Sequence, residues 1–355
     1  MQYWSQIARH IQPYVPGEQP QNRRYIKLNT NENPYAPSPR AIAAIREAAD
    51  GDLRLYPDPD CRRLRQAFSQ VMGVGEDEVF VGNGSDEVLS VAYQAFFDSG
   101  APPVLFPDIS YSFYPVYASL YSIPCKTIPL RDDFSVDVSD YFIDNGGVIL
   151  SNPNAPTSRA LPAADLCRLL DYNKSIGRVV IVDEAYIAFG GESMVPYVRQ
   201  YDNLVVITTL SKSYALAGLR GGFALCHRSL VEAMDRIKNS FNSYTLDRLA
   251  IAGASEAVLD VDHFKTITTQ VIATRDRIAA KLEALGFVVL PSAANFLFIR
   301  HPKKSGEALF ARLREQGILV RHFQKPRISD YLRVSIGTDR QMNVFIDEMK
   351  RIIEE

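Results

Sequence analysis

Residues 204–220 read LVVITTLSKSYALAGLR, and this stretch decides which fold class the sequence predicts. The run Leu204–Thr208 is apolar and rich in β-branched residues, as expected for a buried strand. Lys212 follows it closely and is expected at the carboxyl end of that strand, where ligands bind in parallel sheets. Lysine forms imines with aldehydes, and Ser211 and Arg220 can donate to a phosphate. The alternative is a solvated loop lysine beside a surface arginine.

Outward from this stretch, short apolar strands alternate with helical segments. Further strands are expected at Glu78–Val81, Pro103–Phe106, Cys125–Pro129, Gly147–Leu150, Val179–Asp183 and Gly222–Cys226. Helices are expected at Arg40–Asp50, Cys61–Met72, Asp86–Phe97 and Ala163–Ser175. This alternation predicts an α/β fold with a mostly parallel central sheet covered by helices on both faces.

The pattern changes after about Asn242. A long helix is expected at Val261–Leu285, and Gly286 is placed to end it. Strands are expected at Phe287–Leu290, Asn295–Ile299, Ile318–Arg321 and Tyr331–Ile336, and a final helix at Arg340–Ile353. The sequence therefore predicts a large domain over residues 40–242. An N-terminal arm (1–39) and a smaller α+β domain (243–355) complete the chain.

Composition excludes several classes of function. The 355 residues carry a formal net charge of -2, which argues against a nucleic-acid partner. The four cysteines are widely spaced and form no metal or redox motif, which favours free thiols in a reducing compartment. There is no signal-peptide pattern and no apolar run long enough for a bilayer. We therefore expect a cytoplasmic protein with no membrane and no metal.

A second apolar run, Val179–Tyr186 (VVIVDEAY), ends in an acid at another strand end. A carboxylate beside a pyridine nitrogen raises that nitrogen's pKa, which keeps the ring an electron sink. Asp183 is therefore a candidate partner for such a ring, and Tyr186 is a candidate donor to the ring's hydroxyl oxygen. The alternative for Asp183 is a helix N-cap.

Two loops add further candidate binding groups. Val81–Glu87 (VGNGSDE) is a glycine-rich turn between a strand and a helix, where backbone N–H groups form an anion site. Glycines also serve ordinary tight turns, so this signal is weak alone. Asp108–Tyr114 is rich in aromatic residues, and Tyr111 is a candidate to stack on a flat ring. Core packing is the alternative for these aromatic residues.

Two more stretches complete the set. Ser151–Thr157 (SNPNAPT) follows a strand, and its two X-Pro bonds predict a rigid loop in which either bond can be cis. Asn154 in this loop is a candidate contact for the ring oxygen. Tyr331–Gly337 (YLRVSIG) places Arg333 on an otherwise apolar strand, which suggests a paired anion. That anion is either a substrate carboxylate or an internal acidic residue.

Together, these stretches resemble the fold-type I aminotransferases, and within them the histidinol-phosphate aminotransferase family. The resemblance covers almost the whole chain, from Pro13–Gly17 to Leu332–Gly337. Asn31–Pro34 (NENP) and Gly82–Glu87 (GNGSDE) are the stretches that point to this subfamily. The resemblance implies pyridoxal 5′-phosphate as cofactor and a homodimer. It also implies reversible transamination of L-histidinol phosphate with 2-oxoglutarate, giving imidazole acetol phosphate and glutamate, in histidine biosynthesis.

The resemblance also implies the roles of the site residues. Lys212, Asp183 and Tyr186 would be catalytic, with Lys212 holding the cofactor as a Schiff base. The implied cofactor-binding residues are Tyr56 (from the other subunit), Gly84, Ser85, Asp86, Tyr111, Asn154, Asp183, Tyr186, Ser211, Lys212 and Arg220. The implied substrate-binding residues are Tyr14, Asn33, Tyr244, Arg321 and Arg333. Of these, Arg333 would bind the α-carboxylate, and Arg321 with Tyr14 would meet the substrate's phosphate.

Three stretches depart from the family pattern. The family often has Asn-Asn-Pro-Thr-Gly where this chain has Asn154–Ser158 (NAPTS). Ala215 stands where glycine is common, and Asn242–Asp247 lacks the usual proline. These changes affect pocket shape, so an aromatic-amino-acid aminotransferase and a phosphothreonine decarboxylase remain alternatives. A non-catalytic regulator that binds the cofactor is disfavoured, because no basic helix-turn-helix accompanies the domain.

Overall fold

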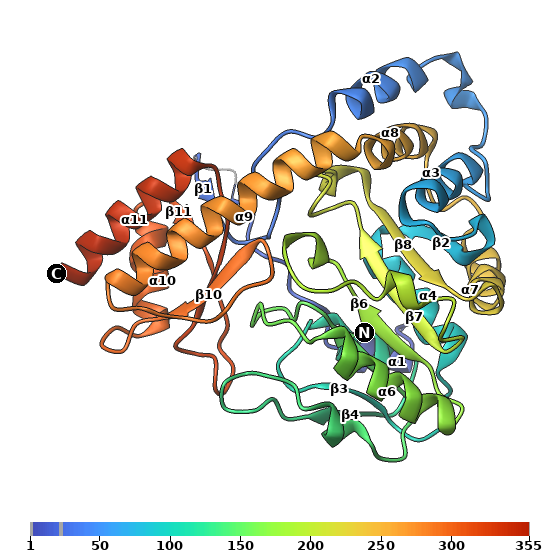
Figure 1. The fold of residues 1–355 in the computed structure, drawn as a ribbon, viewed down its shortest axis with the longest axis horizontal. Coiled ribbons are helices and arrows are strands. Elements are labelled where there is room, and N and C mark those ends of the chain that lie inside the picture. Colours follow the sequence, from blue (N-terminus) through green and yellow to red (C-terminus); the bar gives the residue numbers. More distant parts are fainter. Residues whose placement is uncertain (1–2, 21–23, 355) are drawn as a thin grey trace.

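The computed structural model describes residues 3–20 and 24–354, which form two lobes joined by a long helix (Figure 1). Residues 1–2 and 21–23 of the expected arm, and residue 355, lie outside this description. Each lobe is built on its own sheet, and a further pair of short strands lies in the smaller lobe. Among the described residues, no helix combines the length and apolarity needed to cross a membrane.

The larger lobe contains a seven-stranded sheet in the order β2-β8-β7-β6-β5-β3-β4. Its strands are β2 (Val79–Asn83), β3 (Val104–Pro107), β4 (Cys125–Ile128), β5 (Gly147–Ser151), β6 (Val180–Asp183), β7 (Leu204–Thr209) and β8 (Gly221–Cys226). Strand β8 runs antiparallel to β2 and β7, whereas the other neighbouring pairs are parallel. The predicted mostly parallel sheet is confirmed.

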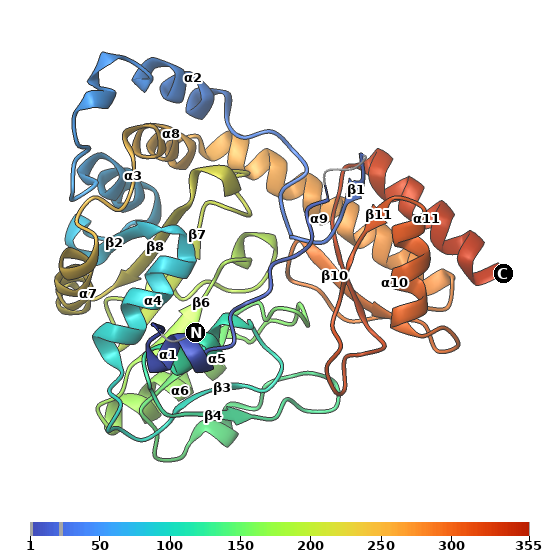
Figure 2. The ribbon, with the colours of Figure 1, turned by 180° about the vertical axis from the view of Figure 1, so that it is seen from behind.

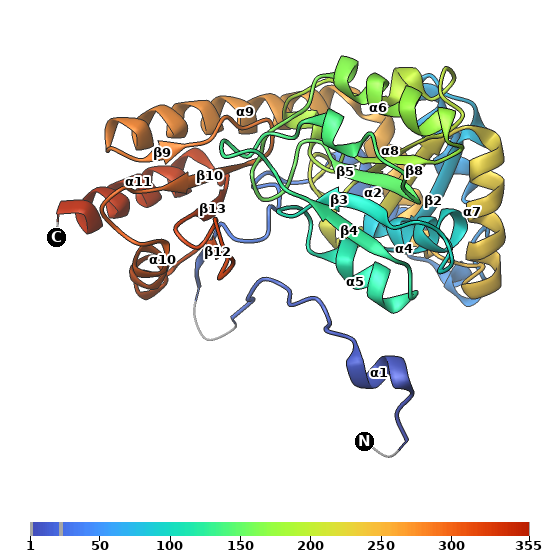
Figure 3. The same ribbon diagram turned by 90° about the horizontal axis from the view of Figure 1, so that it is seen from below.

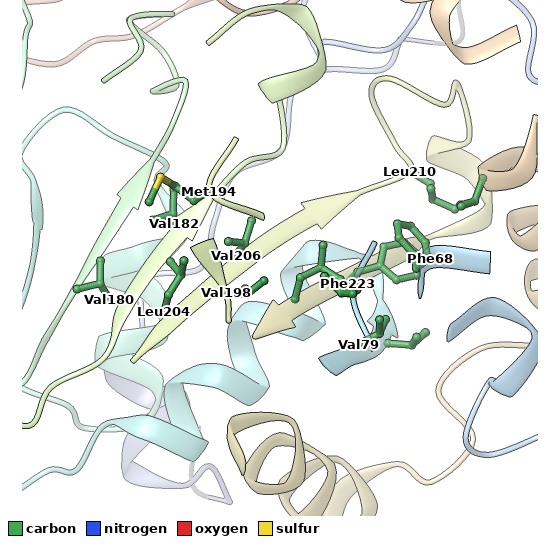
Figure 4. Close-up of a cluster of buried hydrophobic side chains, with 14 of the residues drawn as sticks. Phe68, Val79, Val180, Val182, Met194, Val198, Leu204, Val206, Leu210 and Phe223 are labelled. Atoms are coloured by element: carbon green, nitrogen blue, oxygen red, sulfur yellow. The ribbon is translucent and has the colours of Figure 1, made fainter. Parts of the chain in front are cut away.

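Helices cover both faces of this sheet. The covering helices are α3 (Arg62–Met72), α6 (Ala163–Ser175) and α8 (Arg248–Leu259) on one face, and α4 (Gly84–Phe96), α5 (Phe113–Leu120) and α7 (Arg228–Phe241) on the other. Successive strand residues point to opposite faces, so Val180 and Val182 pack with the first set and Ile181 with the second. Figure 4 shows Val180 and Val182 in the first of these cores. Burial on both faces explains why the strands lack polar alternation.

The smaller lobe contains an antiparallel sheet in the order β12-β13-β10-β9. Its elements are β9 (Val288–Val289), β10 (Phe296–Arg300), α10 (Gly306–Glu315), β11 (Ile318–Leu319), β12 (Arg321–His322), β13 (Leu332–Ser335) and α11 (Asp339–Glu354). The strand expected at Ile318–Arg321 is two strands. Backbone partners change at Val320, because β11 pairs with β1 (Ile26–Lys27) and β12 pairs with β13. The expected smaller α+β unit is otherwise present.

Helix α9 (Val261–Ala284) connects the lobes (Figures 1 and 2). It follows α8, which packs on α3 and on α2 (Pro39–Ala48) in the large lobe. Its far half contributes Ile278 and Leu282 to the small-lobe core, and Gly286 beyond its end has a φ of 85°. Helix α8 lies after residue 242 but packs in the core of the large lobe. The domain division predicted near residue 242 stays a prediction.

The N-terminal segment is mostly extended, as expected, and passes close to both lobes. It contains one short helix, α1 (Gln6–His10), which extends away from the lobes in Figure 3. Short 3-10 turns complete the secondary structure at Gly51–Arg54, Glu76–Glu78, Val138–Tyr141, Ile187–Phe189, Val195–Tyr197 and Ala217–Leu219.

Gly222 allows β8 to approach the first turn of α4, and this contact yields a test of the packing. A Cβ at residue 222 would lie 2.2 Å from the carbonyl carbon of Gly84 and 2.4 Å from the backbone nitrogen of Ser85. We expect Gly222→Ala to lower the free energy of unfolding by about 1–3 kcal/mol, the usual cost of overpacking. Urea denaturation measures it. Gly100→Ala is the control, since a Cβ there meets nothing within 4 Å. Equal stability of the two variants would contradict this packing argument.

Candidate active site

A cavity of about 320 Å³ lies where the carboxyl ends of the large sheet's strands face the small lobe and the N-terminal segment. Asp183 ends β6, and Lys212 follows β7. Arg333 reaches the cavity from β13 of the small lobe, and Tyr14 reaches it from the N-terminal segment. Residues that are distant in sequence therefore meet at one sheet edge, as expected for a ligand site in such folds.

Lys212 is held at the cavity wall with its amine directed inward. Its Nζ donates a hydrogen bond to the carbonyl oxygen of Thr30 at 3.1 Å. Asn33 Nδ2 donates to the backbone oxygen of Lys212 at 3.0 Å, so Asn33 supports the lysine and does not line the cavity. Burial, with repulsion from Arg333, lowers the pKa of Lys212 to about 8. At pH 7 about one tenth of the amine is therefore neutral and nucleophilic, against roughly one part in three thousand for an ordinary lysine.

Asp183 is a buried carboxylate at the end of β6. It is 4% exposed, and it forms no salt bridge within the described part of the chain. Tyr114 donates its hydroxyl proton to Oδ2 at 3.0 Å, and the N–H of Ala185 donates to Oδ1 at 3.1 Å. Burial raises the pKa of Asp183 to about 6 despite these bonds. A cationic nitrogen in the cavity would therefore be bound strongly by this group.

The turn between β2 and α4 forms an anion-binding cup. Gly84 has a φ of 81°, and a Cβ there would lie 2.6 Å from Nη2 of Arg220. Ser85 and Asp86 line the cavity at the N-terminus of α4, where free N–H groups favour a negative charge. Arg220 Nη2 lies 3.1 Å from Oδ2 of Asp86, and Ser211 lines the cavity close by. This donor set suits a phosphate group.

Tyr111 is fixed beside this cup. Its hydroxyl donates to Oδ1 of Asp86 at 2.8 Å, and its ring lies edge-on to Tyr114 with the centroids 5.7 Å apart. Burial, with the nearby negative charge of Asp86, raises the pKa of Tyr111 well above the usual range. The ring is therefore a neutral, immobile wall of the cavity, consistent with the stacking role predicted for it.

Asn154 lies behind the loop that carries Tyr111. Its Nδ2 donates to the carbonyl oxygen of Ile109 at 2.9 Å, and its Oδ1 accepts from Ser110 Oγ at 2.8 Å. Ala155, the next residue, lines the cavity in its place. The peptide bonds before both prolines of this loop are cis. Asn154 thus holds the tyrosine loop, and its predicted contact with a ring oxygen stays a prediction.

Two guanidinium groups form the opposite wall. Arg333 donates from Nη2 to the carbonyl oxygen of Asn29 at 3.0 Å, and its buried Nε has no partner in the described chain. Arg321 donates to the carbonyl oxygens of Val15 and Pro16 at 3.1 and 3.3 Å. Both guanidinium carbons lie 5.6 Å from the centroid of the Phe323 ring, which partly offsets their mutual repulsion. The wall retains unused donors for anions.

Tyr14 joins this wall, whereas Tyr56 and Tyr244 lie elsewhere. The Tyr14 ring stacks on Phe113 with the centroids 4.3 Å apart. Tyr56 and Tyr244 stack on each other at 4.5 Å on the surface of the large lobe, and Tyr56 is 78% exposed. Neither residue lines the cavity of its own chain. The resemblance assigns all three to one site, with Tyr56 coming from the other subunit, and the roles of Tyr56 and Tyr244 stay predictions.

Sequence reasoning did not identify several residues that hold the site together. Tyr114 binds Asp183, and Asn31 Nδ2 donates to the Tyr186 hydroxyl at 3.0 Å. Glu32 lines the cavity and pairs with Lys27 at 2.7 Å. Tyr114 belongs to the aromatic stretch already noted, so its ring was visible as a candidate.

No cluster of acidic, histidine or cysteine side chains suited to a metal occurs in the described ranges.

Comparison with known proteins adds independent evidence. The family model described as aminotransferase class I and II matches residues 23–349. The chain is 52% identical to a histidinol-phosphate aminotransferase of Clostridium acetobutylicum, over 99% of both sequences. It is 55% identical to histidinol-phosphate aminotransferase 1 of Bordetella parapertussis, over 99% of this chain and 98% of that protein. A solved structure of histidinol-phosphate aminotransferase from Sinorhizobium meliloti in complex with pyridoxal-5′-phosphate is similar with a TM-score of 0.88. Its sequence identity is 25%, covering 100% of this chain and 98% of that one.

The lowered pKa of Lys212 yields a test that needs no bound ligand. With an aliphatic aldehyde and cyanoborohydride, we expect the ratio of Lys212 to Lys303 modification to be highest below about pH 8. The ratio should fall above that pH, because the neutral fraction of Lys212 is then saturated. Peptide mapping by mass spectrometry measures both sites in one sample. A constant ratio between about pH 6 and about pH 10, an interval that spans the lowered pKa of Lys212 and ends near the ordinary lysine value, would contradict the expectation.

Proposed function

The chain belongs to the class I and II aminotransferases, and on this premise we propose that it transfers the amino group of L-histidinol phosphate to 2-oxoglutarate. The products are imidazole acetol phosphate and glutamate, and the reaction belongs to histidine biosynthesis. Identity above one half over nearly the full length to histidinol-phosphate aminotransferases supports this assignment. The fold is that of the fold-type I enzymes. The cavity that joins Lys212 and Asp183 to two arginines is the observation that carries the proposal.

The residues of the cavity fit pyridoxal 5′-phosphate. The cup at Gly84–Asp86 with Arg220 suits the phosphate, and the unpaired carboxylate of Asp183 suits the ring nitrogen. Tyr111 provides a flat neutral surface for the ring. When bound, the cofactor supplies an aldehyde carbon for imine formation and a cationic ring that withdraws electrons. Asp183 would keep the ring nitrogen protonated, because ion pairing raises the pKa of a base.

Lys212 supplies the amine and the proton transfer. Its lowered pKa of about 8 leaves enough neutral amine for attack on a carbonyl carbon. Once a substrate amine replaces it, Nζ is free to take the proton from the substrate Cα and to return it. The bond to the Thr30 carbonyl oxygen holds the amine on one side of the cavity. Asn33 fixes the lysine backbone from behind.

The two arginines account for the two substrates. Glutamate carries a side-chain carboxylate and histidinol phosphate carries a phosphate ester, and a guanidinium pairs with either anion. We assign the α-carboxylate of glutamate to Arg333, whose buried Nε has no hydrogen-bond partner among the described residues. We assign the phosphate to Arg321, which lies beside the N-terminal segment and Tyr14. An apolar substrate without an anion would leave the Arg321 side of the cavity unused.

We also propose a homodimer and a cytoplasmic location. Leu53, Leu55 and Tyr56 are exposed on the large lobe, and Tyr56 stacks on Tyr244. Adjacent exposed large apolar side chains are typical of interaction surfaces. A second copy on this surface would bring Tyr56 and Tyr244 to the partner's cavity.

The cytoplasmic location rests on the pathway and on the free thiols of the described cysteines.

Substrate comparison tests the proposed function. We expect histidinol phosphate with 2-oxoglutarate to yield glutamate at a kcat/KM at least about tenfold above phenylalanine or tyrosine, because neither of these carries a side-chain anion that could pair with Arg321. O-phosphothreonine, which does carry a phosphate, is assayed beside them for release of carbon dioxide. A coupled glutamate assay, with product identification by mass spectrometry, measures this. Lys212→Ala is the control and should abolish turnover. A preference for phenylalanine or tyrosine would reassign the protein to aromatic transamination, and carbon dioxide release from O-phosphothreonine would reassign it to decarboxylation.

Arg321→Gln tests the phosphate assignment. We expect the variant to lower kcat/KM for histidinol phosphate by roughly 10–100-fold, since a charge-assisted hydrogen bond is lost. Unphosphorylated histidinol should lose little, which separates phosphate binding from loosening of the N-terminal segment that Arg321 also holds. Arg300→Gln is the matched control, because Arg300 bonds to Tyr331 outside the cavity. Equal losses for both substrates would refute the assignment.

A further inference from the structure

The hydroxyl group of Tyr186 accepts a hydrogen bond from a buried side chain. Asn31 Nδ2 donates to it at 3.0 Å. Tyr186 lines the cavity, and its ring is fixed edge-on against Phe296 with the centroids 5.1 Å apart. An amide N–H can only donate, so the tyrosine oxygen must accept here. The tyrosine proton is therefore left to bond with a ligand in the cavity.

The orientation of the Asn31 amide follows from its other contacts. Ser335 Oγ donates to Asn31 Oδ1 at 2.9 Å and accepts from the backbone N–H of Asn31 at 2.9 Å. Ser335 is 2% exposed and does not line the cavity. With the amide reversed, the buried serine proton would lose its acceptor, whereas the Tyr186 proton can always find one in the cavity. Satisfying every buried group selects the orientation described.

Asn31 itself has little freedom to move. It is 1% exposed and adopts a φ of 56°, a conformation that asparagine tolerates better than most residues. Its carbonyl oxygen accepts from Asn295 Nδ2 at 2.9 Å. The contacts tie Asn31 to the strand that also carries Arg333, two residues before Ser335 and on the same face of the sheet.

No neighbouring amide replaces this arrangement. Ala155 forms the cavity wall and packs in the same apolar cluster as Tyr186. The amide of Asn154 is already bonded to Ile109 and Ser110, behind that wall. Within the described chain, donation to a ring oxygen on this side of the cavity therefore depends on Tyr186.

We propose that Asn31 is a positioning residue, which together with Ser335 holds the Tyr186 hydroxyl as proton donor to the phenolic oxygen of the bound pyridoxal phosphate. This inference rests on the proposed function, because it takes the cofactor as the ligand. A donor at that oxygen stabilises its anionic form. This chain of hydrogen bonds from Ser335 through Asn31 to Tyr186, called the relay below, thereby favours loss of the proton that the bound cofactor shares with Lys212.

Asn31→Asp tests the relay with almost no change in shape. A carboxylate accepts where the amide donated, so it draws the Tyr186 proton away from the cofactor. We expect the pH midpoint of the bound cofactor's absorbance change to rise by about one unit, the scale of one charged hydrogen bond. Tyr186→Phe should raise the midpoint similarly. Substrate-free spectrophotometric titration of the holoenzyme measures both.

The double variant separates positioning from simple charge. If Asn31 acts through the tyrosine, Asn31→Asp adds nothing to the midpoint of Tyr186→Phe. A second rise of similar size would mean that the new charge acts directly, and it would overturn the proposal. Ser335→Ala, which frees the amide to rotate, should give a smaller rise in the same direction and guards against poor folding of the Asn31 variant. An unchanged midpoint in both Asn31→Asp and Ser335→Ala would also overturn the proposal.

Failure of the relay and failure of the proposed function are distinguishable in this design. If the wild-type protein shows no cofactor absorbance that depends on Lys212, the cofactor assignment is at fault. If the wild type binds and titrates the cofactor while Asn31→Asp and Ser335→Ala titrate with the wild-type midpoint, only the role of Asn31 is wrong. Substrate identity does not enter, because no substrate is added.

Discussion

The burial of the Asp183 carboxylate at the end of β6 is the constraint on which the rest of the site depends. The strand before it is apolar and covered on both faces, and Asp183 at its end lines the cavity. Burial raises the pKa of Asp183 to about 6, and above that pH an empty site holds an uncompensated charge. A cationic ring nitrogen relieves that cost, so the same packing that builds the sheet favours the cofactor.

The positive charge of Arg333 affects the protonation of Lys212 across the cavity. Arg333 repels a proton from Lys212, which helps to keep that amine neutral while no substrate is bound. An anion on Arg333 removes much of this repulsion, so Lys212 becomes a stronger base once the substrate is in place. In the proposed function, the guanidinium would therefore both bind the substrate and adjust the pKa of the lysine. Proximity in the folded chain makes this possible, since the two residues belong to different lobes.

Sequence reasoning predicted the parts of the fold and site that depend on local pattern. Apolar runs gave the strands, and a lysine and an acid at two strand ends gave the centre of the cavity. The next 3-10 turn begins at Ile187 with Tyr186 at its N-cap, so Asp183 does not cap it, although its carboxylate accepts the N–H of Ala185. The role of Asp183 toward a ring nitrogen stays a prediction. The roles of Asn31 and Ser335 depend on how the N-terminal segment crosses the small lobe. No local periodicity encodes that crossing, and the change of strand partners at Val320 escaped notice for the same reason.

The N-terminal segment has a consequence for how such proteins diversify. Residues Tyr14–Gln19 form part of the cavity wall, yet none of them belongs to a hydrophobic core, which along the described chain begins at Leu28. Arg321 donates to the backbone carbonyl oxygens of Val15 and Pro16, and these bonds do not depend on the side chains there. Other contacts do restrict the segment: Tyr14 stacks on Phe113, Glu18 pairs with Arg314, and a Cβ at Gly17 would lie 2.7 Å from Thr30. Substitutions in this segment that keep these contacts would therefore reshape the cavity wall at little cost in folding stability. Duplicated genes with this design can acquire new substrate preferences while the catalytic centre stays intact.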